Sequence, residues 1–183
     1  MTQIWIVRHG EAAASWEKDP DPGLSQLGQS QAEETANALM DIVPTGAQLI
    51  SSPLRRAQET AAAFANKRGD SVRVDSRFSE VRSPVPLSGR KAWLQEFMRQ
   101  DWSEQSDDLW EWRRDILSGL KEATGPTVVF CHFLVINAVI AEIENKPEVL
   151  QVYPANASFH ELKLAGGELS LVQLGQQMET RIN

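Results

Sequence analysis

The chain has 183 residues, of which 42% are hydrophobic and 23% are charged. These values are ordinary for one folded domain, and they exclude a disordered or fibrous protein. The formal net charge of −7, without any long block of Lys and Arg, excludes a sequence-independent hold on nucleic acid. We therefore expect a single domain over residues 1–183 that binds any anion through a locally built site.

Location and redox chemistry are constrained by what the sequence lacks. It has no basic-then-apolar leader and no apolar run of membrane-spanning length, so we expect a cytoplasmic protein without a membrane partner. Cys131 is the only cysteine, which excludes an intrachain disulfide and the thiolate clusters of structural zinc sites. We expect Cys131 to be a buried strand residue, with a redox role beside His132 as the alternative.

Residues 4–7 (Ile-Trp-Ile-Val) predict a short buried strand that leads directly into Arg8, His9 and Gly10. In open α/β sheets, ligands bind in the crevice outside the carboxyl ends of the strands. A guanidinium, an imidazole and a glycine at such an end indicate an anion site, where Gly10 would let backbone N–H groups approach a phosphate. The alternative is that His9 is a satisfied histidine at the sheet margin and Arg8 is a surface charge.

A loop and the first helix come next. Residues 12–23 are rich in Pro, Gly and charge and show no period, which predicts a loop over the strand end. Ser25 is then the expected N-cap of a helix that reaches about Ile42, with Pro44 ending it. This helix would cross back along the sheet.

The second strand and helix carry another cation. Residues 48–50 predict a short strand, and the helix after it should have Ser52 as N-cap and Pro53 at its first position. Arg55 then lies in the first helical turn, where a cation opposes the helix dipole unless an anion is supplied. A solvated arginine is the alternative for Arg55.

A titratable group follows the third strand. Residues 72–75 alternate as an edge strand does, and Glu80 follows it. Residues 81–124 then break the alternation of strand and helix with a proline-bearing loop and two helical patterns. We interpret residues 81–124 as a helical insertion over the site, whose tryptophans are packing residues or, alternatively, line the pocket.

The last third of the chain restarts the sheet. Residues 127–131 predict a buried strand that ends on His132, as the first strand ends on His9, and the helix after it should pack back onto the sheet. Residues 159–164 and 169–174 predict an edge hairpin. His160 alternates with Leu residues, which indicates a structural role, and the tail from Gln176 should be frayed.

These elements predict an α/β fold: a three-layer α/β/α sandwich, mostly parallel, with an antiparallel edge hairpin and a helical insertion over the site. Strand ends would then deliver Arg8, His9, Arg55, Glu80 and His132 to one side of the sheet. Phosphoryl transfer needs these residue types. Guanidiniums neutralise the phosphoryl oxygens, one imidazole attacks phosphorus, a second donates a hydrogen bond, and a carboxylic acid protonates the leaving group.

Four motifs occur in one order along the chain: residues 8–11 (Arg-His-Gly-Glu), 24–32, 51–61 and 131–132 (Cys-His). In these motifs and their spacing, the chain resembles the histidine phosphatase superfamily, the phosphoglycerate mutase-like group.

The resemblance implies that His9 becomes transiently phosphorylated in a pocket made by Arg8, Arg55 and His132. Glu80 lies where such enzymes carry the acid, and it would protonate the leaving oxygen and then activate water. The resemblance implies no metal and no other cofactor. The expected partner is a small phosphorylated substrate or a phosphoprotein, and the oligomeric state is left open.

Further residues are expected at the pocket edge. Gly10 and Glu11 belong to the first motif, and Asn156 lies in an Asn-x-Ser that resembles the one many members carry before the last hairpin. Phe133 stands where many members have glycine, so it would narrow the pocket or remove a backbone donor. The segment after Glu80 does not match the Trp-Glu-Gly that mutases carry, which favours a phosphatase over a mutase.

Three cations follow the proposed acid: Arg82, Arg90 and Lys91. They suggest a substrate with a second anionic group, and solvated surface charge is the alternative. Two other functions stay open. The first is a protein phosphohistidine phosphatase, which needs no dedicated acid because imidazole is a good leaving group. The second is a catalytically silent member that binds a phosphorylated ligand.

Overall fold

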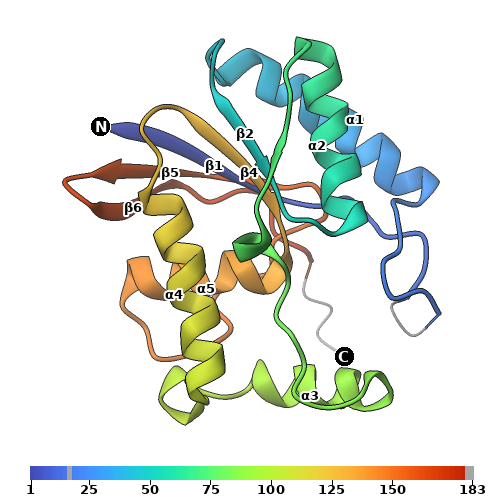
Figure 1. Cartoon of the computed structure of the whole chain (residues 1–183), viewed down its shortest axis with the longest axis vertical. Helices are drawn as coiled ribbons and strands as arrows, with labels where there is room; N and C mark the ends of the chain where they lie inside the picture. The colour runs from blue at the N-terminus through green and yellow to red at the C-terminus, as the bar shows by residue number, and fades with distance from the viewer. Residues whose placement is uncertain (16–17, 180–183) are drawn as a thin grey trace.

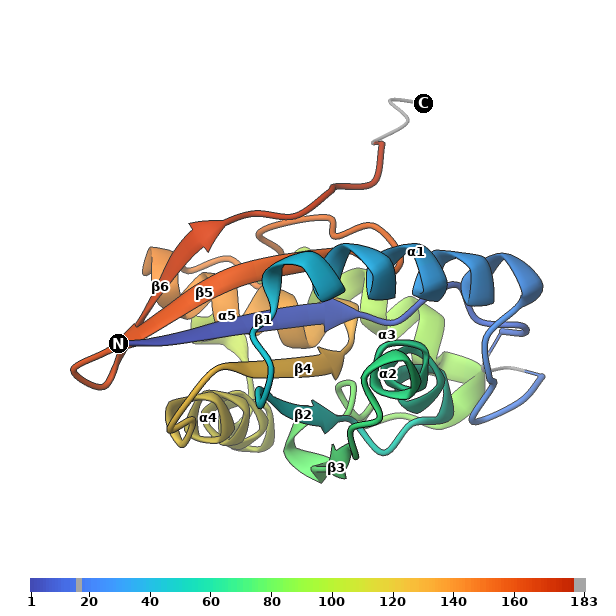
Figure 2. The same cartoon turned by 90° about the horizontal axis from the view of Figure 1, so that it is seen from above.

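One six-stranded sheet runs through the computed structural model, which describes residues 1–15 and 18–179, in the order β3-β2-β4-β1-β5-β6 (Figure 2). The strands are β1 (Thr2–Arg8), β2 (Gln48–Ser51), β3 (Arg73–Val74), β4 (Thr127–Cys131), β5 (Phe159–Ala165) and β6 (Glu168–Gln173). Strands β1 to β4 are parallel, whereas β5 runs antiparallel to β1 and to β6. The predicted parallel sheet with an antiparallel edge hairpin is confirmed.

Helices cover both faces of the sheet (Figure 1). They are α1 (Gln26–Ile42), α2 (Arg55–Arg68), α3 (Arg90–Phe97), α4 (Asp107–Lys121) and α5 (Phe133–Glu144). On one face, Leu39 of α1 and Phe64 of α2 pack against the sheet residue Trp5. On the other face, Ile116 of α4 and Val139 of α5 belong to the cluster built on the sheet. The three-layer prediction is therefore confirmed.

The register of the central strands brings chemistry-bearing residues together. Arg8 of β1 pairs with Cys131 of β4, so the residues that follow them, His9 and His132, leave the sheet side by side. The His9 N–H donates to the Cys131 carbonyl at 3.1 Å, and the Ser52 N–H donates to the Phe130 carbonyl at 2.9 Å. The register of β1 against β4 therefore determines which residues meet at the base of the site. The hydrophobic periodicity of the sequence does not specify this register.

The predicted start is confirmed for helix α1 but not for helix α2. Helix α1 begins after Ser25, whose hydroxyl accepts from the Gly28 N–H at 3.0 Å, as predicted. The predicted start of α2 is wrong, because the helix begins at Arg55 with Leu54 at the N-cap. The Ser52 hydroxyl instead lies 2.7 Å from His132 Nε2, and the chain stays extended at Leu54.

The insertion over residues 81–124 divides into two parts. Helix α3 contributes Leu94 and the following Met98 to the hollow that holds His9, as an insertion over the site would. The prediction is wrong for α4, because its apolar stripe packs onto the sheet face beside α5. Trp102 is 3% exposed and contacts Phe97, which agrees with a packing role.

Three smaller predictions can be compared with the structure. His160 is buried and accepts from the Gly175 N–H at 2.8 Å, which is a structural role. Cys131 is fully buried, and burial raises the pKa of its thiol. The tail is not frayed at Met178, whose N–H donates to the Tyr153 carbonyl at 2.7 Å, while residues 180–183 lie outside the described part. In the described residues, no helix is long and apolar enough to cross a membrane.

Candidate active site

A hollow of about 350 Å³ holds His9 together with four other ionisable side chains. The charged lining residues are Arg8, Arg56, Glu80 and Arg90, and Phe133 forms part of the wall. Of the residues predicted from sequence, the structure thus brings Arg8, His9, Glu80 and Phe133 to one cavity. Three guanidiniums around one imidazole make a local anion site in a protein whose net charge is negative.

His9 is held in one tautomer. Its Nδ1 lies 2.6 Å from the Gly10 carbonyl oxygen, which only accepts, so Nδ1 carries the proton. Its Nε2 accepts from the Arg56 Nε–H at 3.1 Å. Burial, with the charge of Arg56, lowers the pKa of His9 to about 3. The imidazole is therefore neutral, with its lone pair on Nε2, which is the form that can attack phosphorus.

Arg56, and not Arg55, is the arginine of α2 at this site. The side chain of Arg55 is 64% exposed, and its Nε–H donates to Glu59 at 2.9 Å on the far side of the helix turn. Successive helical residues point about 100° apart, so only one of the two can face His9. The prediction that Arg55 lines the pocket is wrong. The i, i+4 pairing of Arg55 with Glu59 was the sequence signal that Arg55 faces solvent.

His132 lies beside His9 and is completely buried. The two ring centroids are 5.2 Å apart in an edge-on arrangement, but His132 does not itself line the hollow. The Ser52 hydroxyl accepts from the Leu54 N–H and lies 2.7 Å from His132 Nε2. If that hydroxyl donates its hydrogen to Nε2, the ring proton is on Nδ1, and burial lowers the pKa of His132 well below its usual value.

Two buried side-chain nitrogens of the site have no hydrogen-bond partner. Among the described residues, the unpaired buried side-chain atoms include Arg8 Nε and His132 Nδ1. The guanidinium of Arg8 also donates through Nη1 to the Pro154 carbonyl at 2.8 Å and lies 5.2 Å from the centroid of Phe133. Each unpaired buried donor costs about 1–3 kcal/mol. An anionic ligand that accepts from these donors would remove that cost.

Glu80 is the buried carboxyl of the site. Its Oε1 accepts from the Val81 N–H at 3.0 Å, and its Oε2 accepts from the Leu134 N–H at 3.2 Å at the start of α5. Burial raises the pKa of Glu80, and these N–H groups together with Arg56 and Arg90 only partly oppose the rise. Trp112 Nε1–H donates to the Ser79 carbonyl at 3.1 Å and so fixes the loop that carries the carboxyl. Glu80 is suited to hold a proton until it is needed.

Gly10 and Glu11 do not contribute donors to the hollow. The Gly10 N–H donates to Thr60 Oγ1 at 3.1 Å, and Gly10 does not line the hollow, so its own N–H is not available to a phosphate there. A Cβ on Gly10 would collide with the Gly28 carbonyl, which explains the glycine there. Glu11 Oε1 accepts from the Ser25 hydroxyl at 2.8 Å and supports the start of α1.

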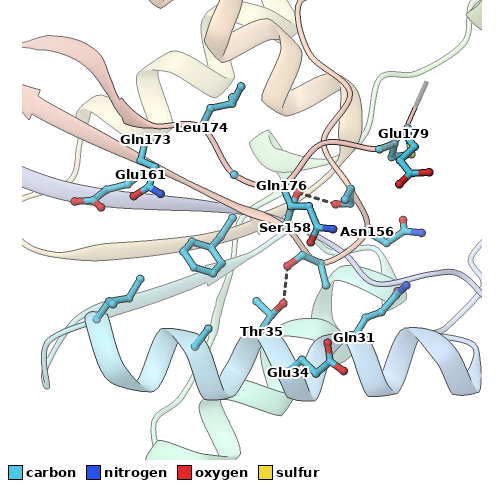
Figure 3. Close-up of a pocket in the computed structure, with 17 residues that line it drawn as sticks. Gln31, Glu34, Thr35, Asn156, Ser158, Glu161, Gln173, Leu174, Gln176 and Glu179 are labelled. Carbon is cyan, nitrogen blue, oxygen red and sulfur yellow. Dashed lines mark hydrogen bonds between the residues drawn. The ribbon is translucent and has the colours of Figure 1, made fainter. Parts of the chain in front are cut away.

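Arg82 and Asn156 lie outside the hollow of His9. Arg82 lines a neighbouring hollow of about 490 Å³ that shares Arg56, Glu80 and Arg90 with it. Asn156 lines a larger hollow of about 850 Å³ between α1 and residues 173–179, which holds neither His9 nor Glu80 (Figure 3). Arg90 lines both of these smaller hollows, and its guanidinium donates to the Val81 carbonyl at 2.9 Å. The expectation that Asn156 lies at the edge of this pocket is wrong.

The described residues contain no group of three His, Cys, Asp or Glu side chains placed to hold a metal ion. His9 contacts the Gly10 carbonyl and Arg56, His132 contacts the Ser52 hydroxyl, and Glu80 accepts from two backbone N–H groups.

Comparison with known proteins gives matches of two kinds. The chain is 35% identical over 85 residues to a glucosyl-3-phosphoglycerate phosphatase of Mycolicibacterium vanbaalenii, covering 44% of this chain and 37% of that one. It is 28% identical over 130 residues to a probable phosphoglycerate mutase of an Enterobacter species, covering 69% and 54%. The matched segments thus span about half or less of these relatives.

Among solved structures, Bacillus stearothermophilus YhfR has the same fold, with a TM-score of 0.77 at 16% identity, over 97% of this chain and 98% of that one. The model of the histidine phosphatase superfamily (branch 1) matches residues 4–177, and the protein therefore belongs to this superfamily.

Proposed function

We propose that this protein is a metal-independent phosphatase that hydrolyses phosphomonoesters through a phosphohistidine on His9. The observation that carries the proposal is the state of His9: neutral, with Nδ1–H bound to Gly10 and Nε2 facing Arg56 in a cationic hollow. Similarity to a glucosyl-3-phosphoglycerate phosphatase supports the same class of reaction.

In the first step, the guanidiniums of Arg8, Arg56 and Arg90 offset the charge of the phosphoryl oxygens. The Arg56 Nε–H moves from His9 Nε2 to a phosphoryl oxygen, which frees the lone pair to attack phosphorus in line. The P–O bond to the leaving group breaks, and Glu80 gives its proton to the leaving oxygen. His132 supports the transferred group through its unpaired Nδ1–H.

In the second step, the Glu80 carboxylate removes a proton from water. The water oxygen attacks phosphorus, the bond from phosphorus to His9 Nε2 breaks, and inorganic phosphate forms. His9 returns to its neutral form and Glu80 to its acid form, so the cycle closes without another reactant. The raised pKa of Glu80 favours ester substrates, whose alkoxide leaving groups need an acid, over phosphohistidine substrates.

The test is hydrolysis of nitrophenyl phosphate in EDTA, combined with an alkaline quench that preserves phosphohistidine. The wild type should turn over and give a phosphorylated protein in intact mass spectra. His9→Ala should lose both signals. His160→Asn is the matched control, because it removes a buried histidine that does not line the hollow, and it should keep both signals. Full activity in His9→Ala, or activity lost in EDTA and restored by a divalent cation, would contradict the proposal.

A further inference from the structure

Apart from its ionisable side chains, the hollow that holds His9 is lined by apolar residues. The remaining side chains that line it are apolar, and they include Ala14, Pro22, Leu94, Met98, Phe133 and Met178. In the described part of the chain, the polar side chains of this lining are His9, Glu80 and the three arginines, and no Ser, Thr, Asn, Gln or Tyr is among them. The charged groups are those that the reaction itself uses. Nothing in this lining is therefore left to bind hydroxyl groups of a substrate.

This lining discriminates between leaving groups. Enclosing a hydroxyl without a hydrogen-bond partner costs about 1–3 kcal/mol, whereas each buried methylene contributes about 0.8 kcal/mol. We infer that the enzyme selects phosphomonoesters with a compact apolar leaving group, a single aryl or alicyclic ring, and that Leu94 and Met98 hold this ring. The inference rests on the proposed function and names its substrate class.

Size and shape agree with a single ring. A volume of about 350 Å³ is near the lower limit of small-molecule sites, which span roughly 300–1,000 Å³. Phe133 forms a fixed wall, because Arg8 lies over its face at 5.2 Å and Tyr153 meets it edge-on at 6.3 Å. Met98 and Met178 are unbranched and adapt to the outline of the ring.

The neighbouring hollow of about 490 Å³, lined by Arg82, is the alternative binding site for the leaving group. It shares Arg56, Glu80 and Arg90 with the first, but it also carries Ser83 and Arg82, which would suit a polar or anionic group. His9 lines only the first hollow among the described ones, so the phosphoryl group must enter there. The two possibilities predict opposite substrate rankings and respond to different substitutions.

The test compares cyclohexyl phosphate with myo-inositol 1-phosphate, which share a six-carbon ring and a secondary alkoxide leaving group. Because an apolar pocket rejects added hydroxyls only moderately, we expect kcat/KM to favour cyclohexyl phosphate by about 10–200-fold. Leu94→Gln and, separately, Met98→Gln should reduce that ratio at least several-fold. Arg82→Ala, in the neighbouring hollow, and Met40→Gln, on the exposed face of α1, should leave it unchanged.

Binding to the His9→Ala variant separates this inference from the proposed function. Calorimetry on that variant should show tighter binding of cyclohexyl phosphate than of inositol 1-phosphate, whether or not the wild type turns them over. A wild type that hydrolyses neither ester while His9→Ala keeps this preference would overturn the proposed function alone. The inference fails if inositol 1-phosphate is preferred or equal, if neither ester binds, or if only Arg82→Ala changes the ratio.

Discussion

At the scale of single residues, the two histidines that follow β1 and β4 use different ring nitrogens to bind the protein. The paired nitrogen is Nδ1 in His9 and Nε2 in His132. His9 Nδ1 donates to the Gly10 carbonyl, which leaves Nε2 as the lone pair. His132 Nε2 lies 2.7 Å from the Ser52 hydroxyl, and its Nδ1 is buried without a partner, so Nδ1 is a free donor when Ser52 donates to Nε2. In the proposed mechanism one imidazole therefore acts as the nucleophile and the other as a hydrogen-bond donor, although both follow a buried strand.

The neighbouring arginines of α2 provide a matched pair of substitutions. Arg56→Ala should lower kcat/KM by about 10²–10³, because it removes a charged donor aimed at the reacting group. Arg55→Ala removes only an exposed i, i+4 ion pair with Glu59 and should change kcat/KM by less than about threefold. Steady-state kinetics on both variants decide the assignment, and equal losses would mean that both arginines contact substrate.

Glu80→Gln tests the acid through the leaving group. An alkoxide needs a proton as the P–O bond breaks, whereas nitrophenolate hardly does, so kcat/KM, which reports the first step, should fall about a hundredfold more for alkyl phosphates than for nitrophenyl phosphate. The pKa of Glu80 is raised by burial, so the alkaline limb of kcat for alkyl esters should lie above the range of an ordinary glutamate, and it should vanish in Glu80→Gln. Small, equal losses on both substrates would show that another group supplies the proton.

The wrong assignment of Arg55 in place of Arg56 shows what the sequence does not specify for single residues. The motif places two arginines after the second strand, and the helical pattern of Ala57 and Phe64 is compatible with either, so the i, i+4 spacing of Arg55 and Glu59 is a weak local signal between them. Their difference is one step of about 100° around the helix, and it depends on where α2 begins. That start depends in turn on Ser52 binding His132, a contact between residues 80 positions apart in the chain.

At the scale of elements, local signals were sufficient where the cap is local. The Ser25 hydroxyl caps α1 by accepting from the Gly28 N–H three residues later, so neighbours in the sequence specify the helix start. The predicted location of helix α4 was wrong because its packing partners are distant in the sequence. Its stripe of Leu and Ile is the same whether it covers a site or a sheet, and only the position of the strands selects the sheet face.

The close packing of α1 against the loop after β1 predicts that a substitution in α1 changes both stability and activity. Gly28 lies against the backbone of Glu11, and a Cβ on Gly28 would collide with the Glu11 carbonyl. Gly28→Ala should therefore push the loop of Gly10 away from α1, with a loss of about 1–3 kcal/mol in the free energy of unfolding and a fall in kcat. The exposed residue Gln29 is the control, and Gln29→Ala should leave chemical denaturation and kinetics unchanged. A Gly28→Ala variant with wild-type stability would contradict this account of the packing.

At the scale of the whole molecule, every histidine of the chain is buried, and burial lowers the pKa of each one. Two of them belong to the site and the third, His160, ties β5 to Gly175. In the unfolded chain, histidine takes up its proton near pH 6.5, whereas His160 in the folded protein does so only at about 4. The unfolded state therefore binds more protons than the folded state between those values.

The sign of this difference predicts acid sensitivity. A lowered folded-state pKa gives stability that is complete above about pH 6.5 and is lost as the pH falls towards about 4. For His160 alone, the loss between pH 7 and pH 5 should be about 2 kcal/mol in the free energy of unfolding. His160→Asn keeps an acceptor near the Gly175 N–H but cannot titrate, so its stability should fall less steeply over that range than that of the wild type. Urea denaturation at pH 7, 6 and 5 measures both slopes. Parallel slopes would mean that His160 is protonated in the folded protein as readily as in the unfolded chain, and that its burial does not oppose the charge.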